Sequence, residues 1–486
     1  MLSLKDTSLL RSKLYIDGNW VDADSGATLP VFNPATGEEI VSIPNAGADE
    51  TRRAIEAAER AFGEWRQVVA KERSAVLKRW FQLIMENQED LAHLMTAEQG
   101  KPLAESRGEV VYGGAFVEWF AEEGRRIYGD TISANKPDQR IVTLKQPVGV
   151  VAAITPWNFP IAMITRKVAP ALAAGCSIVL KPATETPLCA LALAELGERA
   201  GIPAGVFSVV AGKKASAIGG EMTGNPIVRK LTFTGSTEIG KLLMEQCAGT
   251  VKKTSMELGG NAPFIVFDDA DLDAAVAGCM VSKYRNAGQT CVCANRILVQ
   301  EGVFDAFAEK LVAAVKGLKV GNGMDEGVTI GPLINDDAFE KVTAIVKEAT
   351  DKGAKVIEGG GGTAGNNFFQ PTVLVDVDDS MQVYNEEIFG PVAPLFKFKT
   401  EADAIRIGND TPFGLAAYFY SRDIGRIWRV SEGLDYGIVG VNEGLISTEV
   451  APFGGVKESG IGREGSKYGI EDYLEIKYLC MGGIDD

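Results

Sequence analysis

Histidine is almost missing from this chain, and cysteine is scarce: one histidine and seven cysteines occur among 486 residues. The cysteines have neither the density of a disulfide-stapled domain nor the paired CxxC spacing of a zinc site, so we expect a reducing, cytoplasmic location and no metal. The one histidine, His93, lies in the amphipathic segment "EDLAHLM". A reactive cysteine in this chain therefore needs a base other than imidazole.

Long apolar runs and excess positive charge are also missing. Charges interrupt the N-terminal segment, and the apolar stretch "VGVVAAITPWNFPIAMI" contains two prolines and falls short of the roughly 18 residues of a membrane span, so neither a secretion signal nor a membrane partner is expected. Lys and Arg number 49 against 65 Asp and Glu, a net charge of −16. This balance disfavours nucleic acid as a partner but leaves room for a local basic pocket that binds a small anion.

The apolar periodicity separates a helical part from two α/β parts. Apolar residues at three- and four-residue intervals predict helices between residues 50 and 127. From residue 148, short β-branched runs alternate with segments of helical length, and a second such series follows residue 257. The pattern predicts an α/β fold with a doubly wound parallel sheet and a second α/β domain, with ligands at the carboxyl ends of the strands. Peripheral strands expected in 131–147 and near the C-terminus have open edges that association of subunits would cover.

Three loops at predicted strand ends carry polar side chains. In "TPWNFP" two prolines fix the backbone around Trp157 and Asn158, and a fixed amide can donate to an oxyanion, although the asparagine could equally serve its own turn. Lys181 in "LKPATETP" suits ribose or phosphate oxygens, or is simply a solvated lysine. In "FTGSTEIG", Gly235 permits close approach and Ser236 begins a helix whose N-terminus suits a phosphate.

A nucleophile and a base are found in two further loops. Cys291 and Cys293 lie one residue apart in "NAGQTCVCANR", and a thiolate attacks a carbonyl without an imidazole if its surroundings favour ionisation. Glu257 follows an apolar strand in "SMELGGNAP", where desolvation would raise its pKa toward the range of a general base. Glu257 is therefore the natural substitute for the missing histidine.

All these motifs occur in one order, and together they resemble the aldehyde dehydrogenase superfamily along essentially the whole chain. The motifs that carry the resemblance are "PWNFP", "LKPA", "FTGSTEIG", "ELGGNAP", "GQTC", "NEEIFGP" and "PFGGVKESGIGRE". The resemblance implies a homodimer or homotetramer and four parts of the chain. These are a dinucleotide-binding domain (1–129 and 149–256), a catalytic domain (257–445), oligomerisation strands (130–148 and 467–486) and a returning segment that lines the substrate site (446–466).

The resemblance also implies roles for individual residues. Cys291 would be the nucleophile, Glu257 the general base, and Asn158 an oxyanion donor together with the backbone N–H of Cys291. Thiolate addition would give a thiohemiacetal that expels hydride to a nicotinamide, and water activated by Glu257 would hydrolyse the resulting thioester. Lys167 and Glu464 would form a proton path from Glu257. The residues implied to contact the cofactor are Thr155, Pro156, Trp157, Lys181, Thr184, Gly235, Ser236, Glu387 and Phe389.

One departure from the family pattern concerns the cofactor. NAD-preferring members often have a glutamate three residues after the strand-end lysine, and this chain has Thr184 there. A small neutral residue removes charge repulsion against a 2′-phosphate, so NADP is expected to be preferred, with NAD accepted. The neighbouring Glu185 could shift into the missing role.

The substrate is expected to be a carboxylated aldehyde. Within the family the chain is most similar to succinate semialdehyde dehydrogenases, and this implies that Arg166, Arg285 and Ser447 bind the far carboxylate of the substrate. Two arginines in apolar surroundings would be costly without an anion, but a structural ion pair with a protein carboxylate explains them as well. Glutarate semialdehyde remains an alternative, because one methylene is worth only about 1 to 3 kcal/mol in a pocket.

Three further readings stay open at this stage. Cys293 either forms a strained, easily reduced disulfide with Cys291 that switches the enzyme off, or is a small buried cysteine. A cofactor-free thiol hydrolase or acyltransferase would use Cys291, Glu257 and the oxyanion donors but would leave Lys181 unexplained. A non-enzymatic scaffold is the third reading, because fold alone does not prove activity.

Overall fold

The larger sheet of the protein has a parallel centre and antiparallel edges. The computed structural model describes residues 4–363 and 365–484. The strands of this sheet, in spatial order, are β2 (Asn19–Val21), β1 (Leu14–Ile16), β9 (Phe207–Val209), β8 (Ser177–Lys181), β7 (Val150–Ile154), β10 (Val228–Thr234), β11 (Lys253–Glu257) and β21 (Gly460–Ile461). The five strands from β9 to β11 pair in parallel. These central strands are buried, as their β-branched runs predicted.

Helices connect the parallel strands and cover the sheet. The connecting helices are α5 (Ala162–Ala174), α6 (Leu188–Ala200), α7 (Ala215–Gly224) and α8 (Thr237–Ala248). The N-terminal helices are α1 (Ala48–Trp65), α2 (Ala70–Glu86), α3 (Gln88–Gln99) and α4 (Leu103–Glu123), and they follow a hairpin of β3 (Thr28–Phe32) and β4 (Glu39–Pro44). The chain runs outward from β7 through β8 to β9 and then returns to β10 on the other side of β7. Ligands of doubly wound sheets bind at such a switch point, between the carboxyl ends of β7 and β10.

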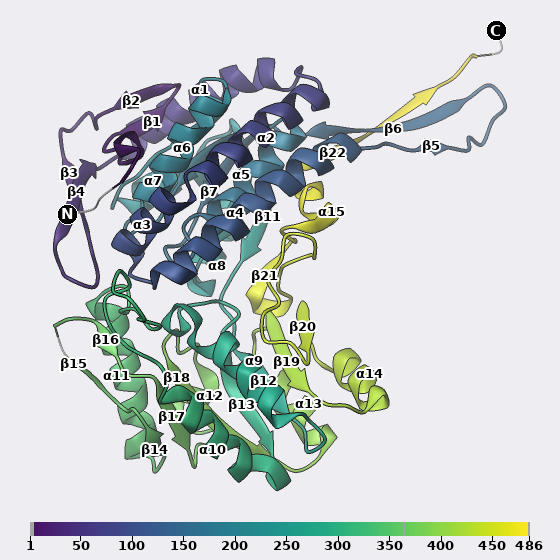
Figure 1. Ribbon diagram of the computed structural model, residues 1–486. Coiled ribbons are helices and arrows are strands. Elements are labelled where there is room, and N and C mark those ends of the chain that lie inside the picture. Colours follow the sequence, from purple (N-terminus) through teal and green to yellow (C-terminus); the bar gives the residue numbers. More distant parts are fainter. Residues whose placement is uncertain (1–3, 364, 485–486) are drawn as a thin grey trace.

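A second α/β unit lies below the first in Figure 1. Its strands, in spatial order, are β14 (Lys355–Glu358), β17 (Thr372–Val375), β18 (Val392–Phe398), β13 (Ala294–Gln300), β12 (Ala262–Val266), β19 (Ala416–Tyr420) and β20 (Ile438–Val441). All neighbours pair in parallel except β14 with β17. Its helices are α9 (Leu272–Tyr284), α10 (Phe304–Val315), α11 (Asp336–Asp351), α12 (Gln382–Asn385), α13 (Glu401–Asn409) and α14 (Ile424–Gly433), and a small hairpin joins β15 (Gly362–Thr363) to β16 (Phe368–Phe369). The predicted fold class, with two α/β units, is confirmed, whereas the exact domain boundaries stay a prediction.

A three-stranded arm projects from the body of the molecule at the upper right of Figure 1. It consists of β22 (Leu474–Met481), β6 (Arg140–Pro147) and β5 (Thr131–Ile132), all antiparallel, and β22 follows the short helix α15 (Ser466–Gly469). The arm exposes the large apolar side chains of Ile132, Leu144, Ile476 and Tyr478. The peripheral strands expected from the sequence therefore exist, and together they form this single arm.

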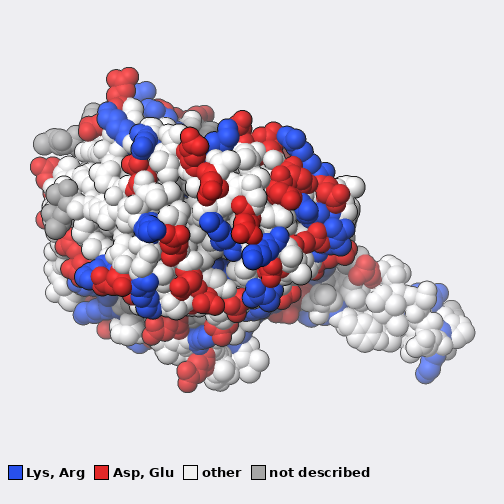
Figure 2. Space-filling model, turned by 90° about the horizontal axis from the view of Figure 1, so that it is seen from below, with Lys and Arg blue, Asp and Glu red and all other residues white. Residues whose placement is uncertain are grey.

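The surface carries mixed charge. Figure 2 shows acidic and basic side chains interspersed over the body on the face viewed, while the projecting arm has few of either sign. No helix within residues 4–363 and 365–484 combines the length and the apolar character needed to cross a membrane.

Candidate active site

The loops at the switch point enclose a cavity of about 260 Å³. Loops after β7, β10 and β11 form one wall, and segments of the second α/β unit form the other. The predicted residues that line this cavity are Pro156, Trp157, Asn158, Gly235, Ser236, Glu257, Cys291, Glu387 and Phe389. Residues from five separate motifs of the sequence thus lie around one space.

Cys291 lies where this cavity meets a second, smaller one. Its side chain is half-buried and unpaired. Burial raises the pKa of the thiol to about 12, although the positive charge of Arg166 opposes this shift. The surroundings of the thiol therefore do not favour ionisation by themselves, and attack by Cys291 needs a base nearby.

Glu257 lines the same cavity as Cys291 and has the features of such a base. It ends β11, it is only 3% exposed, and its Oε2 has no hydrogen-bond partner among the described residues. Burial raises its pKa well above the ordinary value, and the negative charge of Glu464 raises it further. The desolvation expected from the sequence is present, and it makes Glu257 a stronger base than an exposed carboxylate.

Arg166, Lys167 and Glu464 form a buried charged group behind Glu257. The Arg166 Nε and the Lys167 Nζ contact the two carboxylate oxygens of Glu464, and all three side chains are at most 4% exposed. The guanidinium of Arg166 also lies over the ring of Phe453, 4.5 Å from its centroid. The ion pair with a protein carboxylate, raised above as the alternative for Arg166, is thus present. The Nη1 and Nη2 of Arg166 have no hydrogen-bond partner in the described part of the chain.

Asn158 is held rigidly on both its backbone and its amide. Its carbonyl oxygen accepts hydrogen bonds from Lys101 Nζ at 2.7 Å and from Asn286 Nδ2 at 3.0 Å, while its own Nδ2 donates to the carbonyl of Gln289 at 3.0 Å. The charge of buried Lys101 is balanced by Glu109, whose Oε1 also accepts from Ile161 N at 2.9 Å just before α5. Asn158 is therefore preorganised, as a donor to an oxyanion must be.

The cavity on the far side of Cys291 from the arginines has the features of a dinucleotide site. Ser236 caps the 12-residue helix α8, so a helix N-terminus lies at the wall. A Cβ on Gly235 would lie 2.4 Å from the Phe233 ring, and a Cβ on Gly259 would lie 3.0 Å from Glu387 Oε2. The Gly235 position is closely packed, whereas the flexible Glu387 side chain can yield at Gly259. A glycine turn that leads into a helix N-terminus lets a phosphate approach the backbone, so the residues present fit a nicotinamide dinucleotide.

The aromatic and acidic groups of this cavity are also fixed. Phe389 adopts a left-handed backbone conformation, with φ of 55°, and its ring meets that of Trp157 edge-on at 5.6 Å. Glu387 accepts a hydrogen bond from Gly260 N at 3.1 Å, and burial raises its pKa to about 7. A strained non-glycine residue at a cavity wall indicates a functional constraint.

Two predicted cofactor residues lie behind the wall. Thr155 is buried at the end of β7, and its backbone N–H donates to the carbonyl of Lys181 at 3.1 Å. Lys181 is 6% exposed, its Nζ donates to Pro182 O at 3.2 Å, and burial lowers its pKa. The alternative prediction for this position, a solvated lysine, is therefore wrong.

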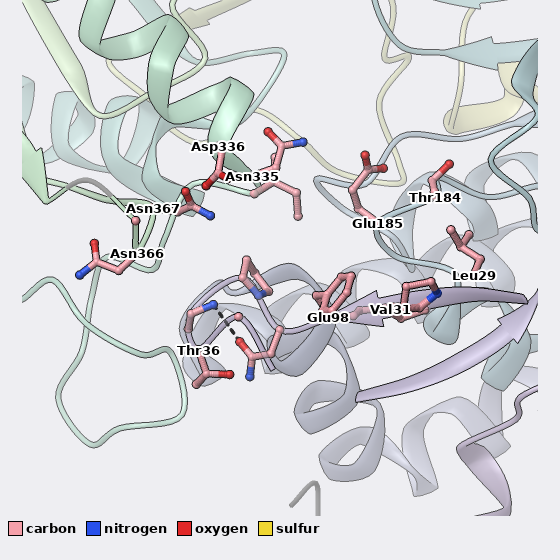
Figure 3. Close-up of a pocket in the computed structure, with 18 of the residues that line it drawn as sticks. Leu29, Val31, Thr36, Glu98, Thr184, Glu185, Asn335, Asp336, Asn366 and Asn367 are labelled. Atoms are coloured by element: carbon pink, nitrogen blue, oxygen red, sulfur yellow. Dashed lines mark hydrogen bonds between the residues drawn. The ribbon is translucent and has the colours of Figure 1, made fainter. Parts of the chain in front are cut away.

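Thr184 lines a different and larger cavity of about 580 Å³. Figure 3 shows Thr184 and Glu185 at one end of it and Asn366 and Asn367 at the other. Lys213 also lines this cavity. Among the described residues, the lining of this cavity and that of the cavity at Cys291 have no member in common. The larger cavity is therefore separate from Cys291, and it includes Thr184 of the predicted cofactor residues.

The second cavity at Cys291 is small and lies beside the arginines. It measures about 20 Å³ and is lined by Tyr112, Phe159, Met163, Arg166, Arg285, Thr290, Cys291, Val292, Ser447 and Phe453. All three predicted carboxylate ligands therefore meet here. Arg285 Nε is buried without a hydrogen-bond partner within residues 4–363 and 365–484, as are the hydroxyls of Tyr112 and Thr290. These unpaired donors need an acceptor, and an anion entering this pocket supplies one.

Cys293 turns away from both cavities. It is buried, and its Sγ lies 3.4 Å from the Nζ of Lys283 in α9. Burial also raises the pKa of this thiol. Of the two interpretations of Cys293, the structure shows the small buried cysteine, and the disulfide with Cys291 stays a prediction.

Sequence reasoning missed several residues of the site. Tyr112 lies in the middle of α4, and nothing in its local pattern distinguishes it from an ordinary packing residue. Lys341 lines the cofactor-side cavity and donates from Nζ to Glu387 O at 2.7 Å. The role of the buried pair Lys101 and Glu109 was invisible because the residues that they support, Asn158 and Ile161, are distant in sequence. Only Thr290 carried a signal, since it stands in the "GQTC" motif itself.

Comparison with known proteins agrees with this geometry. The model of the aldehyde dehydrogenase family matches residues 20–479. The chain belongs to the aldehyde dehydrogenase family. A glutarate-semialdehyde dehydrogenase of Pseudomonas putida is 66% identical over 480 residues, which cover 99% of this chain and all of the relative. A succinate-semialdehyde dehydrogenase (NADP(+)) of Escherichia coli is 64% identical over 482 residues, with coverage of 99% and 100%.

A solved structure of an NADP-dependent enzyme from E. coli superposes with a TM-score of 0.98 at 64% identity, covering 99% of this chain and 100% of the other. The resemblance read from the ordered motifs is thereby confirmed, together with the fold class.

Proposed function

We propose that this protein oxidises succinate semialdehyde to succinate, with NADP as the preferred acceptor. One observation carries the substrate class: Arg166, Arg285 and Ser447 line a pocket that ends at Cys291. An aldehyde carbon at the thiol and a carboxylate at the guanidinium groups would satisfy both ends of such a molecule. The names of the E. coli and P. putida relatives, each of which specifies a semialdehyde of a dicarboxylic acid, support the same class.

The residues of the chain divide the chemistry among them. Glu257 takes the proton of the Cys291 thiol, whose raised pKa makes this help necessary. Cys291 adds to the aldehyde, and Asn158 Nδ2 with the Cys291 backbone N–H stabilises the oxyanion. A bound nicotinamide supplies the hydride acceptor. Glu257 then activates the water that hydrolyses the thioester, while Glu387 and Phe389 orient the cofactor and Lys167 with Glu464 receives protons from Glu257.

The preference for NADP rests on the neighbourhood of Thr184. No carboxylate stands at position 184 itself, and Lys213 lines the same cavity and can pair with a 2′-phosphate, against the carboxylates of Glu98 and Asp336 elsewhere in the lining. Glu185 lines it as well, which leaves NAD as an acceptable alternative. The printed names of the E. coli relative and of the E. coli structure both specify NADP.

The small pocket bears on the length of the substrate. With a volume of about 20 Å³ it must open by side-chain movement to admit the carboxylate of either semialdehyde, and the shorter four-carbon acid requires the smaller movement. Glutarate semialdehyde is the second candidate, because the P. putida relative carries that name at 66% identity. The extra methylene would require the side chains of the pocket to move further, at a cost of about 1 to 3 kcal/mol.

The arm of β5, β6 and β22 supports association into a homodimer or homotetramer. It exposes Ile132, Leu144, Ile476 and Tyr478 on a sheet that nothing covers within the described chain. Exposed apolar side chains on a projecting sheet with open edges are stabilised when a second subunit covers them. The sparse cysteines of the sequence support a cytoplasmic location.

The test is reduced-cofactor absorbance with purified protein in parallel assays. Succinate and glutarate semialdehydes, with butanal as the neutral control, are each offered with NADP and with NAD. We expect the highest kcat/KM with succinate semialdehyde and NADP. Equal rates with butanal would contradict the carboxylate pocket, and no reduced cofactor with any aldehyde under reducing conditions would contradict the dehydrogenase reaction.

A further inference from the structure

The two strands that lead away from Glu257 carry polar side chains along one face. The register of β10 and β11 pairs Thr234 with Glu257, Thr232 with Ser255 and Lys230 with Lys253. Alternate residues of a strand point to the same face, so these six side chains form one continuous ladder. The ladder begins at the proposed base and runs toward the amino ends of the strands.

A polar ladder is costly at this place. Lys230 is fully buried, Ser255 is 4% exposed, and interior strands of parallel sheets are normally apolar throughout. The hydroxyl oxygens of Thr232 and Thr234 have no hydrogen-bond partner among the described residues. Each unpaired buried hydroxyl requires an explanation, and the position of these side chains beside the proposed base points to a role in the reaction.

The far end of the ladder reaches the surface through three groups in contact. Lys230 Nζ donates to Ser255 Oγ, and Ser255 Oγ donates to Asp472 Oδ2 at 2.9 Å. Asp472 is half-buried, in the turn just before β22. Burial lowers the pKa of Lys230 to about 8, with Lys253 and Lys167 acting in the same direction and Asp472 and Glu464 opposing them. This lysine can therefore both take up and release a proton near neutral pH.

The near end of the ladder adjoins the charged group behind Glu257. The negative charge of Glu464 raises the pKa of Glu257, and Glu464 itself forms an ion pair with Lys167. Tyr473 lies close to Lys230, with its ring 5.1 Å from Lys230 Nζ, and burial together with the charge of Glu464 raises the pKa of Tyr473. The charge of Glu464 also acts on Lys230. From Lys230, the hydroxyls of Thr232 and Thr234, unpaired among the described residues, follow on the same face of β10 as far as the position that pairs with Glu257.

We propose that this ladder is the route by which the site discharges protons to solvent. The inference rests on the proposed function: oxidation of an aldehyde to a carboxylate with a nicotinamide cofactor releases two protons per turnover at neutral pH, and both arise beside a fully buried base. The protons pass from Glu257 to Glu464 and Lys167, then past Thr232 and Tyr473 to Lys230. Lys230, Ser255 and Asp472 are positioning and relay groups that do not touch the substrate.

The last step balances without any other reactant. Protonated Lys230 gives a proton to Ser255 Oγ while the Ser255 hydroxyl gives its own proton to Asp472. Lys230 becomes a neutral amine, Ser255 is unchanged, and Asp472 becomes a neutral acid that loses its proton to water. No electrons move in this step.

The test removes single groups of the ladder from the full-length protein. Ser255→Ala deletes the central hydroxyl, and Asp472→Asn removes the charge of the exit carboxylate while it keeps the shape of the side chain. Thr254→Ala is the matched control, because it deletes a hydroxyl one residue away on the opposite face of β11. Each variant is measured for kcat, KM for the aldehyde, affinity for NADP, the solvent deuterium isotope effect on kcat, and thermal unfolding.

We expect kcat to fall about tenfold in both ladder variants, with a larger solvent isotope effect and with KM and cofactor affinity unchanged. Thr254→Ala should match the parent in all five measurements. An active parent whose ladder variants stay within twofold of Thr254→Ala, with the same isotope effect, would overturn the relay alone. A parent without activity would overturn the proposed function, and the relay with it.

Discussion

The two cavities that meet at Cys291 are built in different ways. The cofactor-side cavity is lined mainly by loops at the ends of β7, β10 and β11, and each loop contributes several consecutive residues. The acid-side pocket takes scattered residues from α4, the start of α5, the turn after α9 and the segment near residue 450, and its one consecutive run is Thr290 to Val292. A run of consecutive loop residues can thus be read as a motif, whereas a specificity pocket is assembled mainly by packing.

The difference has a physical basis in charge as well as in geometry. The cofactor side offers a helix N-terminus, glycines and aromatic rings, which suit any nicotinamide dinucleotide. The acid side offers buried guanidinium groups with unpaired nitrogens. Changes on the first side should therefore alter the reaction or the cofactor, and changes on the second should alter the choice of aldehyde.

The largest expected effect comes from the residue shared by both cavities. Cys291→Ser should lower kcat by about 10⁴-fold or more, because a serine hydroxyl is a far weaker nucleophile than a thiol activated by Glu257. Reduced-cofactor absorbance measures it. Cys293→Ala is the matched control and should retain most of the activity under reducing conditions. Similar losses of kcat in the two variants would contradict the assignment of Cys291 as the nucleophile.

The next effect concerns the base. Glu257→Gln should lower kcat about 10² to 10⁴-fold. Because burial raises the pKa of Glu257, the base is protonated at acid pH and becomes active as pH rises, so kcat/KM of the parent should increase with pH, with a midpoint above that of an exposed carboxylate. Steady-state rates across pH check this. A parent rate that falls as pH rises through neutral would show that a different group limits the reaction.

A change at Arg285 tests the comparison of the two cavities on the acid side. Arg285→Ala should raise KM for succinate semialdehyde about 10- to 100-fold, the range expected for a lost hydrogen bond to a charged group, and should leave KM for butanal nearly unchanged. Arg285→Lys keeps the charge and should give an intermediate value. Equal effects on both aldehydes would mean that Arg285 supports structure and does not read the carboxylate.

A change at Thr184 tests the comparison of the two cavities on the cofactor side. Thr184→Glu places a carboxylate where a 2′-phosphate would lie, so the ratio of kcat/KM for NADP over NAD should fall about tenfold or more. Rates with the two cofactors at fixed aldehyde give the ratio. The preference for succinate over glutarate semialdehyde should not change, since Thr184 lines neither cavity at Cys291.

The smallest effect concerns Cys293. If Cys291 and Cys293 form a disulfide on oxidation, inactivation of the parent by peroxide should be reversed by dithiothreitol, and inactivation of Cys293→Ala should be less reversible. Activity before and after reduction measures this. Equal recovery in both proteins would leave Cys293 as a buried packing residue beside Lys283.

The sequence predicted the strands of the parallel sheet and the loops after them because β-branched runs, glycines and prolines act locally. It also supplied Cys291, Glu257 and Asn158, which stand in short motifs at strand ends. It could not supply Tyr112, or the support of Asn158 by Lys101, because these contacts exist only after α4 has packed near the start of α5. The raised pKa of Cys291 was likewise beyond reach, since it depends on burial by distant segments.

The account depends most on Cys291 carrying the acyl group between oxidation and hydrolysis. The direct measurement is rapid acid quench during the first turnover with NADP and succinate semialdehyde, followed by mass analysis of the peptide that contains Cys291. We expect one succinyl group on that cysteine, in an amount equal to the reduced cofactor formed minus the succinate released. Reduced cofactor formed with no added mass on Cys291 at any time would contradict the covalent route and the role of this residue.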